Sequence, residues 1–538
     1  MRIKTLTALR ATLLAAPAAL AFAGAAEAQS CPKTGGTLTY AYSLEPSALS
    51  TIATSAVPVA LVATKIYESL LNYEGPSLEP KPGLAESWTI SPDKKTYTFK
   101  LRPNVKWHDG KPFTAEDVKF SVEKIVKPYH SRGHAYFGEL QDIATPDPLT
   151  VVFTLKKPVP YFMNVFQAGE TPILPAHAFA GVDMSTAASV RGAEIMQKPI
   201  GTGPFRFKEW QKGSYIALER NKDYWLAGFP CLDGIIVRMI PDGAARAIAV
   251  ETGEVDLVPM SGLPEAEVQR LASSPKLETS TAGSEALGPN MWLEVNMREK
   301  PLQDLRVRQA ISMALNRERI ADVIWYGQGK PARGPIVSTG AFFNKSLPAY
   351  EYNPAKAGKL LDEAGYPRGA GNIRFKLTQN FLPYGENWVR LAEYVRQELG
   401  KIGIPVETKS ADLGGWLKTI YTDWNFDLTS TFSHNYSDPS IGVERTFSSA
   451  FIKKGATFTN SMGYVNPRVD ELFAKAAIET DPAERRKQFD ELQEILHHDL
   501  PVIFLMEPSY THVWNKRIHG LITNGISMYS PWAAVWKD

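Results

Sequence analysis

The chain has 538 residues, of which 44% are hydrophobic and 22% are charged, so it is long enough for several domains and has ample apolar side chains for a core. Its 59 Lys and Arg nearly balance its 57 Asp and Glu, which argues against a nucleic-acid-binding protein and against electrostatic attachment to anionic lipid, because both need a basic surface. Its two cysteines are too few for a disulfide-dense scaffold or a multi-cysteine metal site.

The first 28 residues have the pattern of an export signal. Three positive charges in MRIKTLTALR precede the uncharged run ATLLAAPAALAFAGAA. Ala26 and Ala28 supply a small-x-small pattern that predicts cleavage before Gln29. The apolar run is shorter than the roughly 20 residues that a membrane-spanning helix needs. We therefore expect a soluble, exported, periplasmic protein rather than one with an uncleaved anchor.

Cys31 follows the predicted cleavage site, and two alternatives are open for it. It could carry the lipid of a lipoprotein, but Ala28, Gln29 and Ser30 before it match the usual Leu-small-small pattern poorly, so this alternative is less favoured. After export it could instead form a disulfide with Cys231. Both cysteines flank strand-like segments, and the sequence alone does not show whether these segments lie close enough.

The next segments alternate between strands and helices. A strand is expected over 35–43, and a helix over 58–74 that opens with a proline. A hairpin turn is expected at SPDKK. Thr114, with Asp117 three residues later, predicts the start of a helix over 114–126. Further strands are expected at LTVVFTLKK, GPFRFKEW and SYIALERN, and the last two form a hairpin.

The alternation continues in the second half of the chain. Strands are expected at IIVRMI and VDLVP, with a helix between them. A long helix is expected over 304–327, and another at NPAKAGKLLDEAG that ends at Gly365. A strand–helix–strand unit follows at RFKLTQN, NWVRLAEYVRQELGKIG and PVETKSA. Together the elements predict a mixed α/β body with several lobes.

Motifs for catalysis do not assemble into a site. GxSxG, Walker A and HExxH do not occur in the sequence. SxxK occurs at 91–94 and 121–124, but KTG at 33–35 precedes both, whereas exported penicillin-recognising serine enzymes need the reverse order. We therefore predict a protein that is not an enzyme, with no catalytic residue and no cofactor.

Two histidines are candidate metal ligands. His130 and His134 are four residues apart, so on a helix they would share one face and could hold a metal. Pro128 and Gly133 argue against a regular helix here, and a loop is the favoured interpretation. We therefore predict no metal site.

A resemblance to a known family covers nearly the whole mature chain. It is clearest at LAESWTISPDKKTYTFKLRPNVKWHDGKPFTAEDVKFSVEKI (84–125), which resembles the extracytoplasmic solute-binding proteins of family 5. These are the dipeptide-, oligopeptide- and nickel-binding receptors of ABC importers. The resemblance continues in family order at IGTGPF, LERNKDYW, ETGEVDLV, DLRVRQAISMALNRE, NPAKAGKLLDEAGY and HHDLPVIFL.

The resemblance implies an α/β fold of the periplasmic binding protein type II-like class, with two lobes, a hinge and an inserted extra domain (cluster C, three domains). Domain I would comprise residues 29–58, 186–286 and 496–538, domain II residues 59–185, and domain III residues 287–495. Two crossovers between domains I and III would form the hinge, and the ligand would be enclosed between the lobes.

The function implied is that of a periplasmic receptor. It would capture a small peptide-like or other mid-sized solute by hinge closure and deliver it, chemically unchanged, to the permease subunits of an ABC importer in the inner membrane. Alternatives left open are an opine, an oligosaccharide or a metal-chelate ligand, and a chemosensory receptor on the same fold. A monomer is expected, with no nucleic-acid partner.

The resemblance also suggests ligand contacts. In the peptide receptors of the family, an Asp after a domain III strand holds the α-ammonium group, and counting back from Pro439 places this position on Asn435. Asn lacks the charge, which puts an ordinary peptide in doubt, although the neighbouring Asp438 could replace it. The other expected contacts are aromatic or neutral-polar, and they are Tyr42, Ser43, Trp416, Phe432 and His434.

Arg132 is a further candidate. In nickel-binding relatives, a basic residue in this part of domain II contacts the carboxylates of an organic metal chelator, and SRGHAYF resembles that stretch. If Arg132 faces the cleft, an anionic ligand or a metal chelate becomes plausible. A solvent-exposed Arg132 is the simpler expectation.

Overall fold

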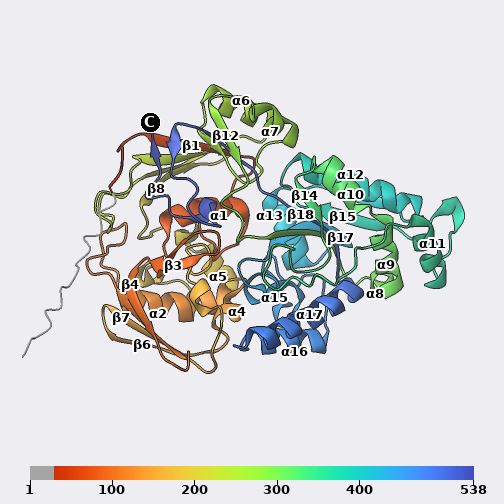
Figure 1. Ribbon diagram of the computed structural model, residues 1–538, viewed down its shortest axis with the longest axis horizontal. Helices are drawn as coiled ribbons and strands as arrows, with labels where there is room; N and C mark the ends of the chain where they lie inside the picture. The colour runs from red at the N-terminus through yellow and green to blue at the C-terminus, as the bar shows by residue number, and fades with distance from the viewer. Residues whose placement is uncertain (1–29) are drawn as a thin grey trace, which may run out of the picture. The chain divides into compact units, whose positions relative to one another are not determined.

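Residues 30–538, which the computed structural model describes, contain three larger β-sheets (Figure 1). The segment from Cys31 to Asp538 forms one unit. The expected signal segment, residues 1–28, lies outside the described residues. Within the described part, no helix combines the length and the apolar character needed to span a membrane.

A seven-stranded sheet forms what we call the first lobe. Its central strand β1 is parallel to β10 and β11, and the outer strands are antiparallel to their neighbours. Leu38 and Tyr40 of β1 are both buried, as the two-residue period of a strand predicts. In spatial order the strands are β12 (Leu277–Ser280), β19 (His512–Asn515), β11 (Leu257–Val258), β1 (Thr37–Tyr42), β10 (Gly234–Met239), β9 (Tyr215–Arg220) and β8 (Phe205–Gln211).

A four-stranded antiparallel sheet forms the inserted lobe. The expected turn at SPDKK is present, because Lys94 N donates to Ser91 O at 2.9 Å between β4 and β5. A capping box of Thr114 and Asp117 opens helix α2 (Ala115–Phe120), and the chain continues helically to Val126. In spatial order the strands are β4 (Ala85–Ile90), β5 (Thr96–Leu101), β7 (Thr150–Leu155) and β6 (Leu140–Asp147). A separate hairpin pairs β2 (Leu71–Glu74) with β3 (Glu79–Pro82).

A six-stranded mixed sheet forms the second lobe. Strand β17 is buried at all seven positions, because it lies between β13 and β15 with both faces covered. Strand β18 pairs in this sheet, although the expected domain I included residues 496–538. The domain boundaries stay a prediction. In spatial order the strands are β14 (Gly329–Pro331), β18 (Val502–Pro508), β13 (Pro289–Val295), β17 (Leu428–His434), β15 (Leu377–Phe381) and β16 (Val406–Lys409).

Within the described residues, two short connections join the first and second lobes. One is the segment 281–288 between β12 and β13, and the other is the segment 509–511 between β18 and β19. The first pairs with the end of β17, since Asn435 N donates to Gly288 O at 2.9 Å. Two adjacent connections of this kind are suited to a hinge.

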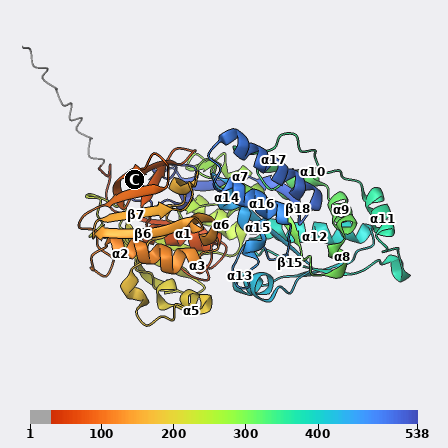
Figure 2. The same cartoon turned by 90° about the horizontal axis from the view of Figure 1, so that it is seen from below.

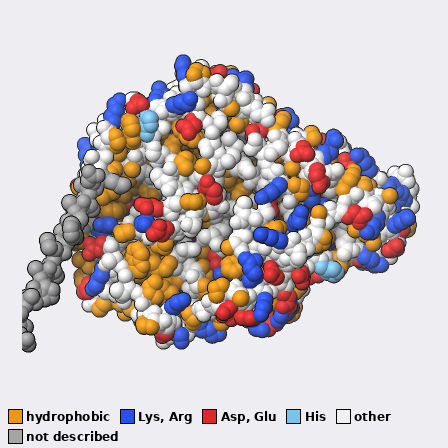
Figure 3. Space-filling view, in the orientation of Figure 1, with side chains coloured by type: hydrophobic (Ala, Val, Ile, Leu, Met, Phe, Trp, Pro, Cys, Tyr) orange, Lys and Arg blue, Asp and Glu red, His pale blue; other side chains and the backbone are white. Residues whose placement is uncertain are grey.

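Helices cover the sheets of both lobes. Seen from below, α16 and α17 lie along the second lobe, and α2 lies with the strands of the inserted lobe (Figure 2). On the face shown in Figure 3, charged side chains of both signs are intermixed over the right-hand part, where helices of the second lobe lie. The longer helices are α1 (Val57–Ile66), α6 (Gly243–Thr252), α7 (Glu265–Leu271), α9 (Leu305–Ala314), α11 (Pro354–Glu363), α12 (Glu386–Lys401), α16 (Pro467–Ala476) and α17 (Pro482–Asp499).

Two expected helices are shorter than predicted. The helix expected over 58–74 ends at Ile66, where Tyr67 is extended and the Ile66 carbonyl oxygen accepts a hydrogen bond from Gly203 N at 2.9 Å. The helix expected over 304–327 is interrupted at Leu315, whose backbone is extended. The next turn is capped separately by Asn316. At Ile66 a tertiary contact overrules the periodic pattern, and at Leu315 a local cap restarts the helix.

Cys31 and Cys231 form a disulfide. It ties the segment before β1 to the segment before β10, and these two strands are parallel neighbours. The Cα atoms of the two cysteines lie 5.4 Å apart, a separation typical of a disulfide. The Cys31 sulfur is thereby engaged, which leaves it no bond for a lipid.

Candidate functional site

A cleft of about 530 Å³ lies between the first and second lobes. Tyr42 and Ser43, at the end of β1, and the turns that precede α6 and α7 form its first-lobe wall. Its volume is within the usual range for small-molecule sites. The opposite wall is rich in aromatic side chains, among them Trp325, Tyr384, Trp388, Phe432 and Tyr510, and it also carries the charged pair Glu386 and Arg390.

Phe432 is the centre of the aromatic wall. Its ring centroid lies 5.9 Å from those of Tyr384 and Trp388, and 5.3 Å from that of His434. Aromatic pairs at these separations hold one another in place and add to the energy of simple burial. The wall therefore offers a rigid apolar surface, and Tyr510 adds a hydroxyl group to it.

Arg246 lies on the first-lobe side, but its charge is already engaged. Its guanidinium donates to the carbonyl oxygens of Ile240, Pro241 and Gly262 at 2.6, 2.8 and 2.5 Å. Burial lowers the pKa of Arg246. These bonds hold the turns before α6 and α7 in place, so Arg246 shapes the wall of the cleft.

Deeper between the lobes lies a group of buried polar residues that we call the inner polar cluster, made of Arg132, Glu170, His434, Tyr436 and Arg445. His434 Nε2 lies 2.9 Å from the Tyr510 hydroxyl, which joins the cluster to the aromatic wall. Arg132 Nη2, from the inserted lobe, donates to the Tyr436 hydroxyl of the second lobe at 2.7 Å. The cluster therefore bridges the lobes.

The charges in this cluster are unevenly paired. Arg132 Nη1 lies 3.2 Å from Glu170 Oε2 without being aligned for a hydrogen bond. Burial raises the pKa of Glu170 more than any other single cause, but the charge of Arg132 and the hydrogen bond from Tyr136, with the other favourable contacts, together outweigh it, and the pKa falls to about 2. Burial lowers the pKa of His434 to about 3, so this imidazole is neutral at neutral pH.

Five of the expected contacts lie in the cleft or the cluster. Tyr42, Ser43 and Phe432 line the cleft, and His434 stands at its inner end. Arg132 belongs to the cluster and is only 1% exposed, so the expectation of a solvent-exposed Arg132 is wrong. Its guanidinium is covered because it stacks on Tyr436, 4.5 Å from the ring centroid.

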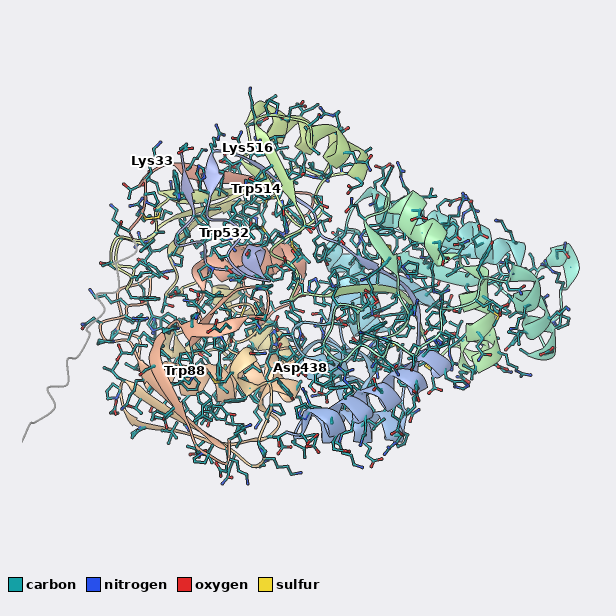
Figure 4. All side chains as sticks on the ribbon, viewed as in Figure 1. Lys33, Trp88, Asp438, Trp514, Lys516 and Trp532 are labelled. Atoms are coloured by element: carbon teal, nitrogen blue, oxygen red, sulfur yellow. A yellow bond between two sulfur atoms is a disulfide. The ribbon has the colours of Figure 1, made fainter. Side chains whose placement is uncertain are left out.

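The other three expected contacts are engaged inside the second lobe. Trp416, in α13 (Leu413–Leu417), is 1% exposed and donates to Thr429 Oγ1 at 3.2 Å. Asn435 accepts from Val337 N at 2.6 Å and donates to Pro335 O at 3.1 Å. The Asp438 carboxylate is bound by Arg485 of α17 (Figure 4). Their part in ligand binding stays a prediction.

Glu170 and Arg445 were not among the expected contacts. Arg445 is the only cation in the run IGVERTFSSAF, which is otherwise apolar or neutral apart from Glu444. Two adjacent charged residues within an otherwise apolar or neutral run indicate that a charged side chain is buried there. Glu170 carries a similar signal, because it is the only Asp, Glu, Lys or Arg between Lys157 and Asp183. What the sequence does not give is its partner, because Arg132 is far away in the chain.

The pair of histidines does not share a helix face. His130 lies between α3 (Lys127–Tyr129) and α4 (Gly133–Phe137), is buried, and stacks on Tyr136. His134 is exposed and contacts Phe451. Among residues 30–538, no three His, Cys, Asp or Glu side chains are grouped so that they could hold a metal ion.

Known proteins resemble this chain over most of its length. Relatives include the glutathione-binding protein GsiB of Pectobacterium atrosepticum, which is 29% identical over 483 residues, or 87% of this chain and 88% of the relative. Among solved structures, the oligopeptide-binding protein AppA of Bacillus subtilis with a nonapeptide is 27% identical, with a TM-score of 0.84, and covers 94% of this chain and 100% of its own.

A second solved structure agrees. The periplasmic binding protein DppA of Helicobacter pylori, in complex with the peptide STSA, is 27% identical with a TM-score of 0.83, over 94% of this chain and 98% of its own. These likenesses confirm the expected fold class and the expected role as a solute-binding receptor of an ABC importer. Residues 79–454 match the family described as bacterial extracellular solute-binding proteins, family 5. The chain belongs to this family.

Proposed function

We propose that the protein binds a small, peptide-like solute in the cleft between its first and second lobes and delivers it unchanged to the permease of an ABC importer. The observation that carries this proposal is the cleft of about 530 Å³, to which both lobes contribute a wall. A solute that touches both walls binds the closed form better than the open form, and this difference in affinity drives closure.

The size and lining of the cleft favour a ligand of a few residues. A cavity of this volume suits a small molecule of drug size. The rings of Trp388 and Phe432 offer apolar contact, and the hydroxyls of Tyr42 and Tyr510 are suited to orienting polar groups. The names of the relatives point the same way, to glutathione and to peptides. We take glutathione and di- to tetrapeptides as the first candidates.

We propose Tyr42, Ser43, Phe432 and His434 as direct contacts of the solute. Arg132, in the inserted lobe, would hold Tyr436 in position through its hydrogen bond to the Tyr436 hydroxyl. Trp416, Asn435 and Asp438 we place behind the contact surface, because each is bonded within the second lobe. We also propose that the chain is divided into the three domains given above. The form that meets the permease would be the exported protein after cleavage of its signal.

Binding and closure can be tested together on the purified protein. Native mass spectrometry would identify a co-purified solute. Isothermal titration with glutathione, di- to tetrapeptides, an opine, an oligosaccharide and a metal chelate would rank the classes. Small-angle scattering with and without the best binder would report closure as a smaller radius of gyration.

The expected result is binding of a peptide-like solute with compaction, and recovery of that solute with unchanged mass. Preference for the oligosaccharide or the metal chelate would contradict the ligand class. Recovery of a chemically altered solute would contradict the receptor function itself.

A further inference from the structure

Arg445, in the short helix α15 (Glu444–Phe447), is a buried cation that has no carboxylate partner in the part of the chain that the structure describes. It is 3% exposed. Among residues 30–538, no carboxylate oxygen lies within 4.0 Å of its guanidinium nitrogens. An unpaired buried charge is costly, and proteins usually pair it. The missing partner therefore calls for an explanation.

The hydrogen-bond acceptors of Arg445 are three neutral hydroxyls, and its guanidinium lies 5.9 Å from the ring centroid of Phe458. Nη1 donates to Ser55 Oγ and to Ser131 Oγ at 3.2 Å each, and Nη2 donates to Ser433 Oγ at 3.3 Å. Its Nε has no hydrogen-bond partner within the described segment, residues 30–538. The three serines come from three different places, before α1, in the inserted lobe and on β17, so the guanidinium lies where the lobes meet.

Other buried arginines are satisfied differently. Arg485 forms two bonds with Asp438, at 2.6 and 2.8 Å. Arg308 and Arg317 donate to several backbone carbonyl oxygens. Carboxylates and carbonyls are stronger acceptors for a guanidinium than serine hydroxyls. Among these four residues, Arg445 is the one that lacks a strong acceptor.

The neighbouring charges do not compensate Arg445. Glu170 is the nearby anion, and it is paired with Arg132. Glu294 accepts from Ser461 Oγ at 2.7 Å, and burial raises its pKa to about 7. Burial, and then the charge of Arg132, lowers the pKa of Arg445 to about 10, which leaves it charged at neutral pH. The region therefore carries an excess of positive charge.

A basic pocket of about 90 Å³ lies next to Arg445, between the inserted and second lobes. Ser131, which accepts a hydrogen bond from Arg445, also lines this pocket. No Asp or Glu is among its lining residues, whereas four cationic side chains are: Lys127, Arg191, Lys453 and Lys454. Cationic side chains gathered in this way make the surroundings of Arg445 attractive to anions.

We propose that Arg445 receives a carboxylate, or another anionic group, of the captured solute, so that the solute class is anionic. This inference rests on the proposed function. The planar guanidinium is suited to two parallel hydrogen bonds with a carboxylate. Because its serine partners come from separate lobes, an anion bound there would also favour the closed arrangement.

The test compares Arg445→Gln with Arg396→Gln, which removes an equal charge from the exposed face of α12. Titrations use glutathione and its diethyl ester, in which both carboxylates are masked, together with a panel of neutral, cationic and anionic peptides. We expect Arg445→Gln to weaken glutathione binding at least about 30-fold, the lower end for removing one partner of a buried charge pair. Masking the carboxylates should weaken binding to the wild type similarly, and Arg396→Gln should change nothing.

A second readout separates binding from folding. Without solute, Arg445→Gln should be at least as stable as the wild type in thermal unfolding, because it removes an unpaired buried charge. Equal binding of a panel solute by Arg445→Gln and by the wild type would overturn this inference and leave the receptor function intact. Failure of every panel solute, whatever its charge, to bind the wild type would overturn the proposed function as well.

Discussion

Arg485 and Asp438 form two hydrogen bonds, at 2.6 and 2.8 Å, in the interior of the second lobe. Asp438 also caps α14 (Pro439–Gly442) through Ser440 N. The carboxylate thus holds a buried cation and the start of a helix at the same time. These two structural roles are sufficient to explain why an acid occupies position 438. No ammonium group of a ligand is needed to explain it.

Asp438→Ala should therefore destabilise the fold. It leaves Arg485 buried without its partner, which costs about 3–5 kcal/mol of unfolding free energy. Urea denaturation followed by tryptophan fluorescence would measure the loss. The control is Asp481→Ala, which removes the exposed cap of α17 and should cost only about 1 kcal/mol. A stable Asp438→Ala protein that no longer binds peptide would instead make Asp438 a ligand contact.

Phe432→Leu should weaken solute binding with little loss of stability. The substitution keeps an apolar side chain but removes the ring that contacts Tyr384 and Trp388. We expect affinity for the best peptide of the panel to fall about two- to tenfold. The stability loss should stay below about 1.5 kcal/mol.

The matched control is Phe489→Leu, on the buried face of α17 and outside the cleft. It should lower stability by a similar amount and leave affinity unchanged in the same titration. Equal loss of affinity in both variants would show that the aromatic wall is not the contact surface.

Reduction of the disulfide should lower stability. Cys31 and Cys231 are separated by 200 residues, so the bond removes a large closed loop from the freedom of the unfolded chain. We expect a loss of about 2–5 kcal/mol when the bond is broken. Thermal unfolding with and without a thiol reductant would measure it. The Cys31→Ser, Cys231→Ser double variant should show the lower stability and no response to reductant, and a reductant-sensitive double variant would contradict this account.

The elements that the sequence predicts well are those set by local chemistry. Thr114 and Asp117 form the expected capping box of α2, and the expected hairpin of β8 and β9 is present. The helix expected to pass Ile66 stops there because Gly203, distant in the sequence, binds its last carbonyl. No periodic pattern in a single segment contains that information.

The candidate site likewise contains residues that local sequence predicts and residues that only the tertiary fold brings together. Tyr42 and Phe432 could be predicted because each lies at or near the end of a strand that the family resemblance singles out. The pairing of Arg132 with Glu170 could not, because only the tertiary fold brings these two distant residues together. The contact of Arg132 with Tyr436 depends in addition on how two lobes meet. Predicted positions on single strands are therefore sound starting points, whereas contacts between distant charged or polar residues need the structure.

Glu68 should make stability depend on pH. It is buried, and its oxygens accept from the Tyr224 hydroxyl at 2.7 Å and the Thr202 hydroxyl at 2.9 Å. Burial raises the pKa of Glu68 to about 7, and the hydrogen bond from Trp225 opposes this rise most. In the unfolded chain the carboxyl has its ordinary, lower pKa, so the folded protein binds more protons between the two values.

The stabilisation that Glu68 contributes to the folded state is therefore fully present below the pKa that Glu68 has in the unfolded chain. It is lost as the pH rises through about 7, the pKa of Glu68 in the fold. Replacing it by Gln, which stays neutral, removes this dependence, so Glu68→Gln should gain about 1–3 kcal/mol relative to the wild type between pH 5 and 8. Urea denaturation at both pH values would measure the difference, with the exposed Glu79→Gln as the control that should show none. A stability difference between Glu68→Gln and the wild type that does not change with pH would mean that Glu68 stays ionised in the fold, and its hydrogen bonds would then outweigh the cost of burial.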